Sequence, residues 1–191
     1  MKILIIILSL ILPFSVNANN YIQDKGVVYY VVDGDTLDIK TTRENLLLLL
    51  RNGLVDEKHI NLKNSTFRLR LANIDTEESV HQDSSKNTNF GKTTSNYVKS
   101  KTINKEVVYE CYRAGYYGRS ICSLSFDGED LGYHLIKNGY SSYLTDFGNH
   151  PTLHWQYRRA QAENAGNKVM GVIKRNEVPE TINNFRNSIF Q

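Results

Sequence analysis

The strongest constraint on the fold is a segment in which apolar and charged side chains alternate, Phe67–Ile74. Because successive side chains of a strand point to opposite faces, this alternation predicts a β-strand whose outer face carries Arg68 and Arg70. Other segments have strand or helix patterns of their own. The further predicted strands are Gly26–Val32, Thr36–Lys40, Glu106–Tyr112 and Ser120–Phe126, and the predicted helices are Phe90–Lys101, Asp130–Asn138 and Pro151–Asn164.

The order of these elements predicts the class of fold. Strands come first, one helix follows, a hairpin comes next, and two helices close the chain. This order is typical of an α+β domain and is compatible with a small five-stranded barrel. The composition agrees with one folded domain, since 40% of the 191 residues are hydrophobic. The formal net charge of +3 allows an anionic partner but does not require one.

The N-terminus has the pattern of a secretory signal peptide. A lysine precedes the apolar run Ile3–Val16, and the small residue Ala18 follows in a context that signal peptidase recognises. A membrane-spanning helix is the alternative, but the run is shorter than the roughly 20 residues needed and contains Pro13. We therefore expect cleavage into a signal peptide, 1–18, and a single domain, 19–191, that is secreted or periplasmic and leaves the membrane.

Two cysteines, Cys111 and Cys122, lie in or beside the two strands of the predicted hairpin. They are too few for a disulfide-dense miniprotein or a four-cysteine zinc site. In an exported protein they can form one disulfide across an antiparallel pair, and closing so short a loop contributes roughly 2–3 kcal/mol. The alternative is a pair of buried free thiols. The predicted export favours the disulfide.

The segment Thr41–Thr66 stands apart from the predicted strands and helices. Thr41 and Glu44 have the spacing of a helix capping box, and five consecutive leucines follow them, Leu46–Leu50. Five consecutive apolar residues extend all the way round a helix, so one buried face cannot hide them all. Two interpretations remain open: a helix that covers the barrel, or a contact for self-association between two copies of the chain.

Carboxylates and arginines gather in segments at predicted strand ends and turns. Val32–Thr36 places two carboxylates around a glycine turn, and Arg70–Glu78 places an arginine in a strand and carboxylates after it. An arginine also follows the turn of the hairpin in Tyr116–Arg119, and Gly128–Gly139 is a strand exit into a short helix. Each segment alone is a weak signal, since Asp-Gly-Asp is usually only a turn.

In this order, the four segments resemble the thermonuclease family, the staphylococcal-nuclease-like enzymes. The motifs that carry the resemblance are Asp-Gly-Asp-Thr, Arg-x4-Asp-Thr-x-Glu, Tyr-Gly-Arg, and Asp-Gly-x-Asp-Leu followed by Lys-Asn-Gly. The similarity extends over a core from about Val27 to about Val172, nearly all of the mature chain. It implies an OB-fold barrel with three helices and a Ca²⁺-dependent nuclease. Such enzymes cleave DNA and RNA and leave a 3′-phosphate and a free 5′-hydroxyl.

The resemblance implies a calcium site. Asp35 and Asp75 match the family's calcium carboxylates, and Thr76 matches the residue that offers its backbone carbonyl. The chemistry of these groups agrees with that assignment, because Ca²⁺ is a hard cation that prefers oxygen ligands and tolerates loose geometry. No cysteine or histidine belongs to the set.

The resemblance also implies a catalytic set. Glu78 matches the family's general base, and Arg70 and Arg119 match its two phosphate-binding arginines. A phosphodiester under attack gains negative charge on its non-bridging oxygens, so fixed cations stabilise the transition state more than the ground state. Arginine suits this role because its planar fork holds two oxygens at once. Water is a poor nucleophile, so a nearby carboxylate is useful as a base.

The sequence departs from the family pattern in several places. Glu77 stands where the family usually has proline, and it adds a carboxylate able to share the metal or base role with Glu78. The segment 41–66 is an insertion after the first hairpin, and the type member lacks the cysteine pair. The tryptophan that usually follows the last helix is absent, and Val172 is near its position.

Two tyrosines before Arg119 are candidates for substrate binding. Tyr116 and Tyr117 can stack on a nucleotide base, which tolerates any sequence, or they can be ordinary surface residues of a hairpin. We favour the substrate-binding interpretation for Tyr117 and leave both open for Tyr116. His150 and His154 are four residues apart, but His150 precedes a proline and is expected to cap the following helix instead of binding zinc.

A catalytically inactive OB-fold module that binds single-stranded nucleic acid is the alternative function. Such a binder does not need three carboxylates and two arginines in the positions of an active site. The chain retains the full set of Asp35, Arg70, Asp75, Glu78 and Arg119. The complete set favours a nuclease with DNA and RNA as substrates.

Overall fold

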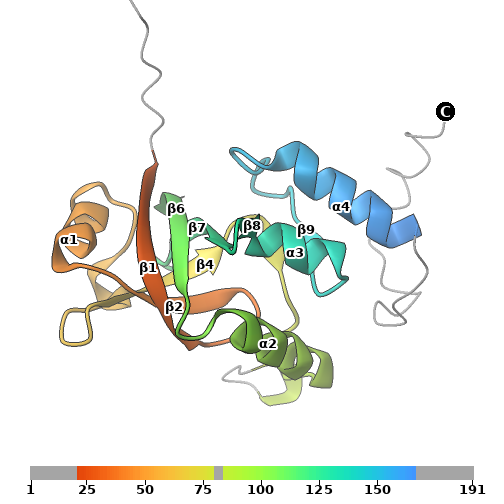
Figure 1. Ribbon diagram of the computed structural model, residues 1–191, viewed down its shortest axis with the longest axis horizontal. Coiled ribbons are helices and arrows are strands. Elements are labelled where there is room, and N and C mark those ends of the chain that lie inside the picture. The colour runs from red at the N-terminus through yellow and green to blue at the C-terminus, as the bar shows by residue number, and fades with distance from the viewer. Residues whose placement is uncertain (1–20, 80–83, 167–191) are drawn as a thin grey trace, which may run out of the picture.

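The computed structural model of the chain describes residues 21–79 and 84–166 (Figure 1). The predicted signal peptide and Val172 lie outside these ranges. Within them, no helix is long and apolar enough to span a bilayer. Strands form a barrel, with α2, α3 and α4 on one side of it and α1 on the other (Figure 1). The helices are α1 (Arg43–Arg51), α2 (Asn89–Thr102), α3 (Leu131–Lys137) and α4 (His154–Gly166), and the 3₁₀ turns are η1 (Glu57–His59) and η2 (Ser84–Lys86).

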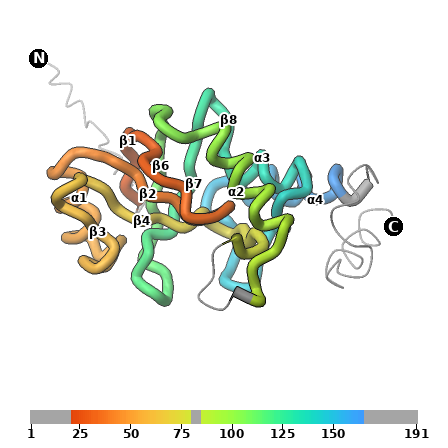
Figure 2. Tube along the Cα trace, turned by 90° about the horizontal axis from the view of Figure 1, so that it is seen from below, coloured from red at the N-terminus to blue at the C-terminus, as the bar shows by residue number. Residues whose placement is uncertain are grey.

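Five strands close into the barrel. They are β1 (Ile22–Val31), β2 (Thr36–Lys40), β4 (Thr66–Leu71), β6 (Glu106–Ala114) and β7 (Ser120–Phe126). Antiparallel pairing joins β1 to β2 and β6, β2 to β4, and β6 to β7, and a parallel pairing of β4 with β7 closes the sheet (Figure 2). The predicted α+β class and five-stranded OB-fold barrel are therefore confirmed.

Four short strands complete the sheets: β3 (Ile60–Asn61), β5 (Ile74–Asp75), β8 (Glu129–Asp130) and β9 (Ser142–Tyr143). β3 and β8 extend the barrel sheet beside β4 and β7, whereas β5 pairs with β9 in a separate ladder. The core inside the barrel comes from alternate strand residues, as the pattern predicts. It includes Leu37, Ile39, Phe67, Leu69, Tyr109 and Leu124, all nearly or fully buried.

The predicted strand Phe67–Ile74 is wrong in one respect, because it is two strands. Asn73 adopts a left-handed backbone conformation with φ of 58°, which ends β4 and turns the chain into β5. The amide of Asn73 donates hydrogen bonds to the carbonyl oxygens of Leu144 (2.9 Å) and Gly148 (2.7 Å). This turn carries the chain from the outer face of the barrel to the ladder that holds Asp75.

The insertion contributes α1, and this helix covers the barrel. Leu46 and Leu49 are fully buried in the same core as the strands, while Leu48 is 43% exposed. The five leucines are therefore divided between core and surface, and self-association stays a prediction. The capping-box prediction is wrong by one residue, because Thr42 is the N-cap and its hydroxyl accepts from the backbone N–H of Asn45 (3.2 Å).

Cys111 and Cys122 form a disulfide between β6 and β7. The two residues face each other directly in the register of the hairpin. The described part of the chain contains no free cysteine. The link ties together the two strands whose connecting turn leads to Arg119.

His150 attaches the chain before α4 to the barrel through a buried polar network. Its Nδ1 accepts the backbone N–H groups of Thr152 (3.2 Å) and Leu153 (3.0 Å), so Nε2 carries the proton and donates to Ser123 Oγ (2.9 Å). His150 therefore caps the turn, as predicted, although α4 begins at His154 and not at Pro151. Since Nε2 donates, this imidazole cannot take a proton from Ser123.

Candidate active site

The turn between β1 and β2 places a buried carboxylate at the barrel end. The backbone N–H groups of Val32 (2.9 Å) and Asp33 (3.3 Å) donate to the carbonyl of Thr36 and close the turn. A side chain at Gly34 would meet Thr94 at 2.6 Å, so only glycine lets the turn pack against α2. The carbonyl of Asp35 accepts from the backbone of β4 at 2.8 Å. Asp35 is therefore fixed from both sides.

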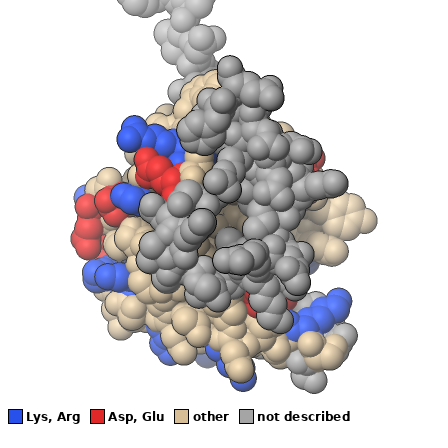
Figure 3. Space-filling model, turned by 90° about the vertical axis from the view of Figure 1, so that its right-hand side faces the viewer, with Lys and Arg blue, Asp and Glu red and all other residues tan. Residues whose placement is uncertain are grey.

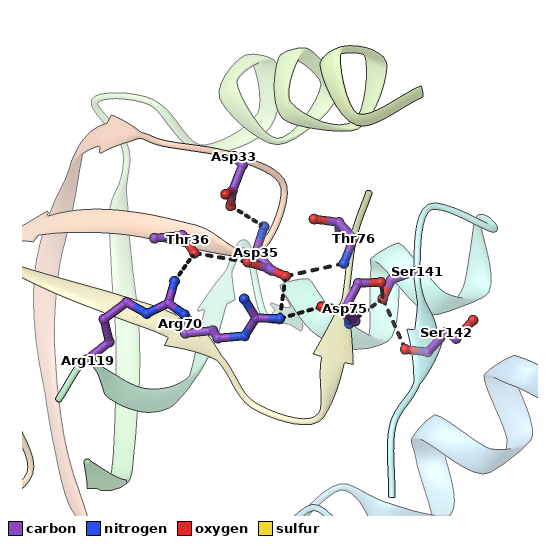
Figure 4. A network of polar contacts seen from close by, with 9 residues as sticks. All are labelled: Asp33, Asp35, Thr36, Arg70, Asp75, Thr76, Arg119, Ser141 and Ser142. Atoms are coloured by element: carbon purple, nitrogen blue, oxygen red, sulfur yellow. Dashed lines mark hydrogen bonds and ion pairs between the residues drawn. The ribbon is translucent and has the colours of Figure 1, made fainter. Parts of the chain in front are cut away.

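The carboxylate of Asp35 is 2% exposed and has three polar partners (Figure 4). Its Oδ1 accepts from the hydroxyl of Thr36 (2.9 Å), and its Oδ2 accepts from the backbone N–H of Thr76 (3.2 Å). Arg70 Nη2 forms an ion pair with Oδ2 at 3.0 Å. Burial raises the pKa of Asp35 to about 6, against the opposing charge of Arg70, and the charge of Asp33 raises it further.

Arg70 bridges the two predicted calcium carboxylates. It lies on β4 directly opposite Thr36, and its Nη2 donates to Asp75 Oδ1 as well as pairing with Asp35 (Figure 4). Burial raises the pKa of Asp75, and Arg70 opposes that shift. Two carboxylates from β5 and the β1–β2 turn thus meet on one cationic nitrogen.

Ser141 holds the backbone of Asp75 in place. The hydroxyl of Ser141 accepts from the N–H of Asp75 (3.0 Å) and lies 2.9 Å from its carbonyl oxygen (Figure 4). The pairing of Asp75 with Ser142 in the β5–β9 ladder adds a second constraint. The backbone that carries the second carboxylate is therefore anchored to the segment that follows α3.

Arg119 reaches the same group of residues from a different strand. It precedes β7, which runs beside β4, and its Nη1 donates to Thr36 Oγ1 at 3.1 Å (Figure 4). Burial lowers the pKa of Arg119, and the neighbouring positive charge of Arg70 lowers it further. The two guanidiniums therefore lie close enough to repel each other while both face Asp35 through direct or Thr36-mediated contact.

Glu78 follows the predicted calcium ligands Asp75 and Thr76 and lies against the start of α2. Its backbone carbonyl accepts from Thr88 N–H (3.0 Å), and a side chain at Gly91 would collide with that carbonyl. The charge of Glu78 raises the pKa of Arg119, against the larger effects of burial and of Arg70, which lower it. Glu77 is exposed beside it. The predicted base therefore acts electrostatically on Arg119.

Tyr116 and Tyr117 lie at the tip of the β6–β7 hairpin, outside the network around Asp35. They are 97% and 67% exposed, and their rings meet edge to face with centroids 5.1 Å apart. Both rings are thus accessible to a ligand. On the side chains visible in Figure 3, Lys and Arg are scattered, and Asp or Glu lies beside several of them. Arg70 and Arg119, by contrast, both contact the group of residues around Asp35.

The donor set around Arg70 suits a hard divalent cation. Within residues 21–79 and 84–166, no group of three or more His, Cys, Asp or Glu side chains is arranged to hold a metal ion. The carboxylates of Asp35 and Asp75, which both pair with Arg70, would supply oxygens of the kind that Ca²⁺ accepts. Both carboxylates already hold one positive charge between them, so the position suits a cation.

Sequence reasoning missed several groups that complete this site. Thr36 belongs to a motif that the sequence displays, but its hydroxyl links Asp35 to Arg119, which only the fold reveals. Ser141 lies 66 residues from its partner Asp75 and has no local pattern that marks it. Thr36 connects two predicted site residues, and Ser141 fixes the backbone of a third.

Comparison with known proteins agrees with this geometry. A family model described as staphylococcal nuclease homologue matches residues 68–171, more than half of the chain. The match includes Arg70, Asp75 and Arg119, whereas Asp35 lies before it and joins the site through the fold. No curated protein matches the chain. The chain therefore belongs to the staphylococcal nuclease family.

Proposed function

We propose that this protein is a secreted nuclease that uses Ca²⁺ to hydrolyse the phosphodiester bonds of DNA and RNA with little sequence preference. The observation that carries the proposal is the convergence of Arg70 and Arg119 on Asp35, with Asp75 on the same nitrogen of Arg70. A structural ion pair does not require two partly buried guanidiniums beside two carboxylates. A phosphate with a nearby cation does.

The two arginines are suited to hold one phosphate from two sides. The contacts of Arg70 to the carboxylates run through Nη2, and a guanidinium has further N–H donors. Arg119 contributes a second fork from β7. Because both guanidiniums are partly buried, their charges act in a lower dielectric than in water and stabilise the more negative transition state.

Glu78 is the proposed base. It accepts a proton from the attacking water as the water oxygen bonds to phosphorus. The bond from phosphorus to the 5′ oxygen then breaks, and that oxygen takes up a proton, which leaves a 3′-phosphate and a 5′-hydroxyl. Asp35, Asp75 and the Thr76 carbonyl would hold Ca²⁺, which would supply positive charge near the phosphate and make water easier to deprotonate. Glu77 is the neighbouring carboxylate, and replacing it serves as the control for replacing Glu78.

Export is part of the proposal. The apolar run Ile3–Val16 and Ala18 support a cleaved signal peptide, and the Cys111–Cys122 disulfide suits an oxidising compartment. N-terminal sequencing of the protein recovered outside the cytoplasm tests this part. A first residue at Asn19 is the expected result, and an intact Met1 in the recovered protein contradicts it.

Product analysis tests the activity. The mature chain from Asn19 is incubated with single- and double-stranded DNA and with RNA, with Ca²⁺ or with a chelator. We expect cleavage of all substrates in Ca²⁺, with 3′-phosphate and 5′-hydroxyl ends. Tight binding of single-stranded nucleic acid without cleavage would instead identify an inactive OB-fold module. The variants Glu78→Gln and Glu77→Gln then separate the two carboxylates, and only the former is expected to lose activity.

A further inference from the structure

The insertion between β2 and β4 is anchored to the barrel along its length. Besides Leu46 and Leu49 of α1, it buries Leu54 and Val55 in the core. At its far end β3 pairs with β4, with Ile60 opposite the core residue Phe67. A segment with core contacts before and after η1 is a firm support for whatever it touches.

This insertion touches the tip of the β6–β7 hairpin. The backbone N–H of Asp56 donates to the carbonyl of Gly118 (2.9 Å), and Nε2 of His59 lies 2.8 Å from the carbonyl oxygen of Tyr117. Since a carbonyl only accepts, His59 donates in this contact. In Figure 2 the tip leaves the barrel on the side where β3 lies.

The contact is close and needs glycine on the hairpin side. Gly118 has φ of 82°, the left-handed conformation that glycine adopts without strain. A side chain there would collide with the carboxylate of Asp56. The segment from Asp56 to His59 and the hairpin turn therefore fit against each other, and this fit is specific to a chain that has the insertion.

The hairpin tip has few other supports. Its turn is closed by its own backbone bonds, Gly118 N–H to Gly115 O (2.8 Å) and Gly115 N–H to Arg119 O (2.7 Å). Tyr116 is almost wholly exposed. The insertion donates its hydrogen bonds to the carbonyls of the two residues directly before Arg119. Movement of the tip therefore also moves the backbone from which the Arg119 side chain extends.

We propose that Asp56, through its backbone, and His59 are positioning residues for Arg119, and that the insertion is a support for the active-site hairpin. The proposal rests on the proposed nuclease function, because it assigns the support to a phosphate-binding arginine. Neither residue needs to touch the substrate. Because misplacing a catalytic group by about 1 Å can cost up to 10²-fold in rate, loss of one support is expected to lower kcat by about ten-fold.

Matched pairs of variants isolate the two hydrogen bonds. His59→Phe keeps a ring without the donor, and His59→Gln restores an N–H donor. Asp56→Pro removes the backbone donor and suits the local φ of −81°, whereas Asp56→Ala keeps that donor and removes only the carboxylate. Lys63→Ala, an exposed position elsewhere in the insertion, is the control for general effects.

Hydrogen exchange and kinetics are measured on the mature chain. We expect His59→Phe and Asp56→Pro to speed amide exchange at Gly115 and Gly118 several-fold and to lower kcat about ten-fold. His59→Gln, Asp56→Ala and Lys63→Ala should stay near wild type in both measurements. In an Arg119→Ala background, His59→Phe should cause no further loss of kcat, because its effect runs through Arg119.

Several results would overturn the inference. Unchanged exchange at the tip in both disruptive variants would show that the contact supports nothing. An equal loss of kcat in His59→Phe and His59→Gln, or a full further loss in the Arg119→Ala background, would exclude positioning through the hydrogen bond. If the wild-type chain cleaves nothing, the proposed function fails. The inference is then judged on amide exchange and on the affinity for a single-stranded oligonucleotide. That affinity must weaken in His59→Phe and stay at the wild-type value in His59→Gln.

Discussion

The protein buries two polar networks, one around His150 and one around Asp35, and they follow opposite rules. Around His150 three neutral side chains form a directed chain, from Nε2 of His150 to Ser123 (2.9 Å) and from Ser123 to Tyr112 (2.8 Å), and a single carboxylate accepts at its end. The hydroxyl of Tyr112 then donates to Glu110 (3.0 Å). Around Asp35, by contrast, charged groups face one another.

Burial acts on both networks in the same direction, toward the neutral form. It lowers the pKa of His150 to about 4 and raises the pKa of Asp35 to about 6. His150 is neutral at pH 7, and its hydrogen bonds suit that state. Asp35 is charged at pH 7 in spite of its burial, and Arg70 partly compensates it.

The difference indicates that one network serves stability and the other serves binding. A network of neutral hydrogen bonds that ends on one carboxylate gains nothing from a ligand, whereas a buried charge cluster open to a cation or an anion does. Changes around Asp35 should therefore affect activity and ligand response, and changes around His150 should affect stability.

Calcium removal should have the largest effect on activity and should distinguish the two networks most clearly. We expect a chelator to abolish cleavage and added Ca²⁺ to restore it. Because binding to the folded state stabilises it by about 2.7 kcal/mol at a hundred times the Kd, Ca²⁺ should also raise Tm. Asp75→Asn should lose both responses, and His150→Asn should keep both. Equal activity in Mg²⁺ or without metal would show that the calcium assignment is wrong.

Replacing Arg119 should give the next largest effect. Arg119→Ala removes one cation from the site, and loss of one such donor costs roughly 10²–10³ in kcat. Arg119 donates a hydrogen bond to the neutral hydroxyl of Thr36, so the free energy of unfolding should change little. Arg113→Ala, an exposed arginine on the same hairpin, is the control for charge alone. Steady-state kinetics and chemical denaturation check both, and a wild-type rate in Arg119→Ala would remove this residue from the site.

The effect of His150 should appear as a pH dependence of stability. Its folded pKa of about 4 lies below the unfolded value of about 6.5, so between these values only the unfolded chain takes up the proton. This group therefore contributes stability at neutral pH that falls by roughly 2–3 kcal/mol as the pH drops from about 6.5 to about 4. Denaturation at several pH values measures it.

His150→Asn is the variant that isolates this effect. An asparagine oxygen can still accept the N–H groups of the turn, but it does not titrate. The raised pKa of Asp35 acts on stability in the opposite sense, and His154 and Tyr143 lie beside His150. Only the difference between wild type and variant is therefore informative. Parallel pH profiles of the two chains would contradict the assignment.

The sequence predicted the charged network better than the neutral one, and the reason is physical. Asp35, Arg70 and Asp75 lie in short motifs at strand ends, and their residue types fit one kind of chemistry. The network of His150 joins residues from β6, β7 and the turn before α4. Each of these is an unremarkable polar residue in its own segment, so only the tertiary packing brings them together.

The barrel was predictable because each strand carries its own alternation of apolar residues. The errors fall where one residue overrides a pattern. Asn73 turns the chain so that β4 ends at Leu71 and not at Ile74, and His150 caps a turn that delays the start of α4 to His154. The contact of His59 with Tyr117 spans 58 residues, and it has no periodicity that could reveal it.

Replacing the two tyrosines at the hairpin tip should have the smallest effects on kinetics. These variants test whether substrate binding extends beyond the charged network. A base stacked on an aromatic side chain contributes about 1–3 kcal/mol, so Tyr117→Ala should raise KM about ten-fold with kcat nearly unchanged. Tyr117→Phe keeps the ring and should match wild type, whereas loss in that variant would assign the effect to the hydroxyl. Tyr116, at 97% exposure, points further into solvent, and Tyr116→Ala should change KM by no more than about two-fold. Equal effects of the two alanine variants would mean that the tip binds substrate through its backbone shape, in which case neither ring is a stacking platform.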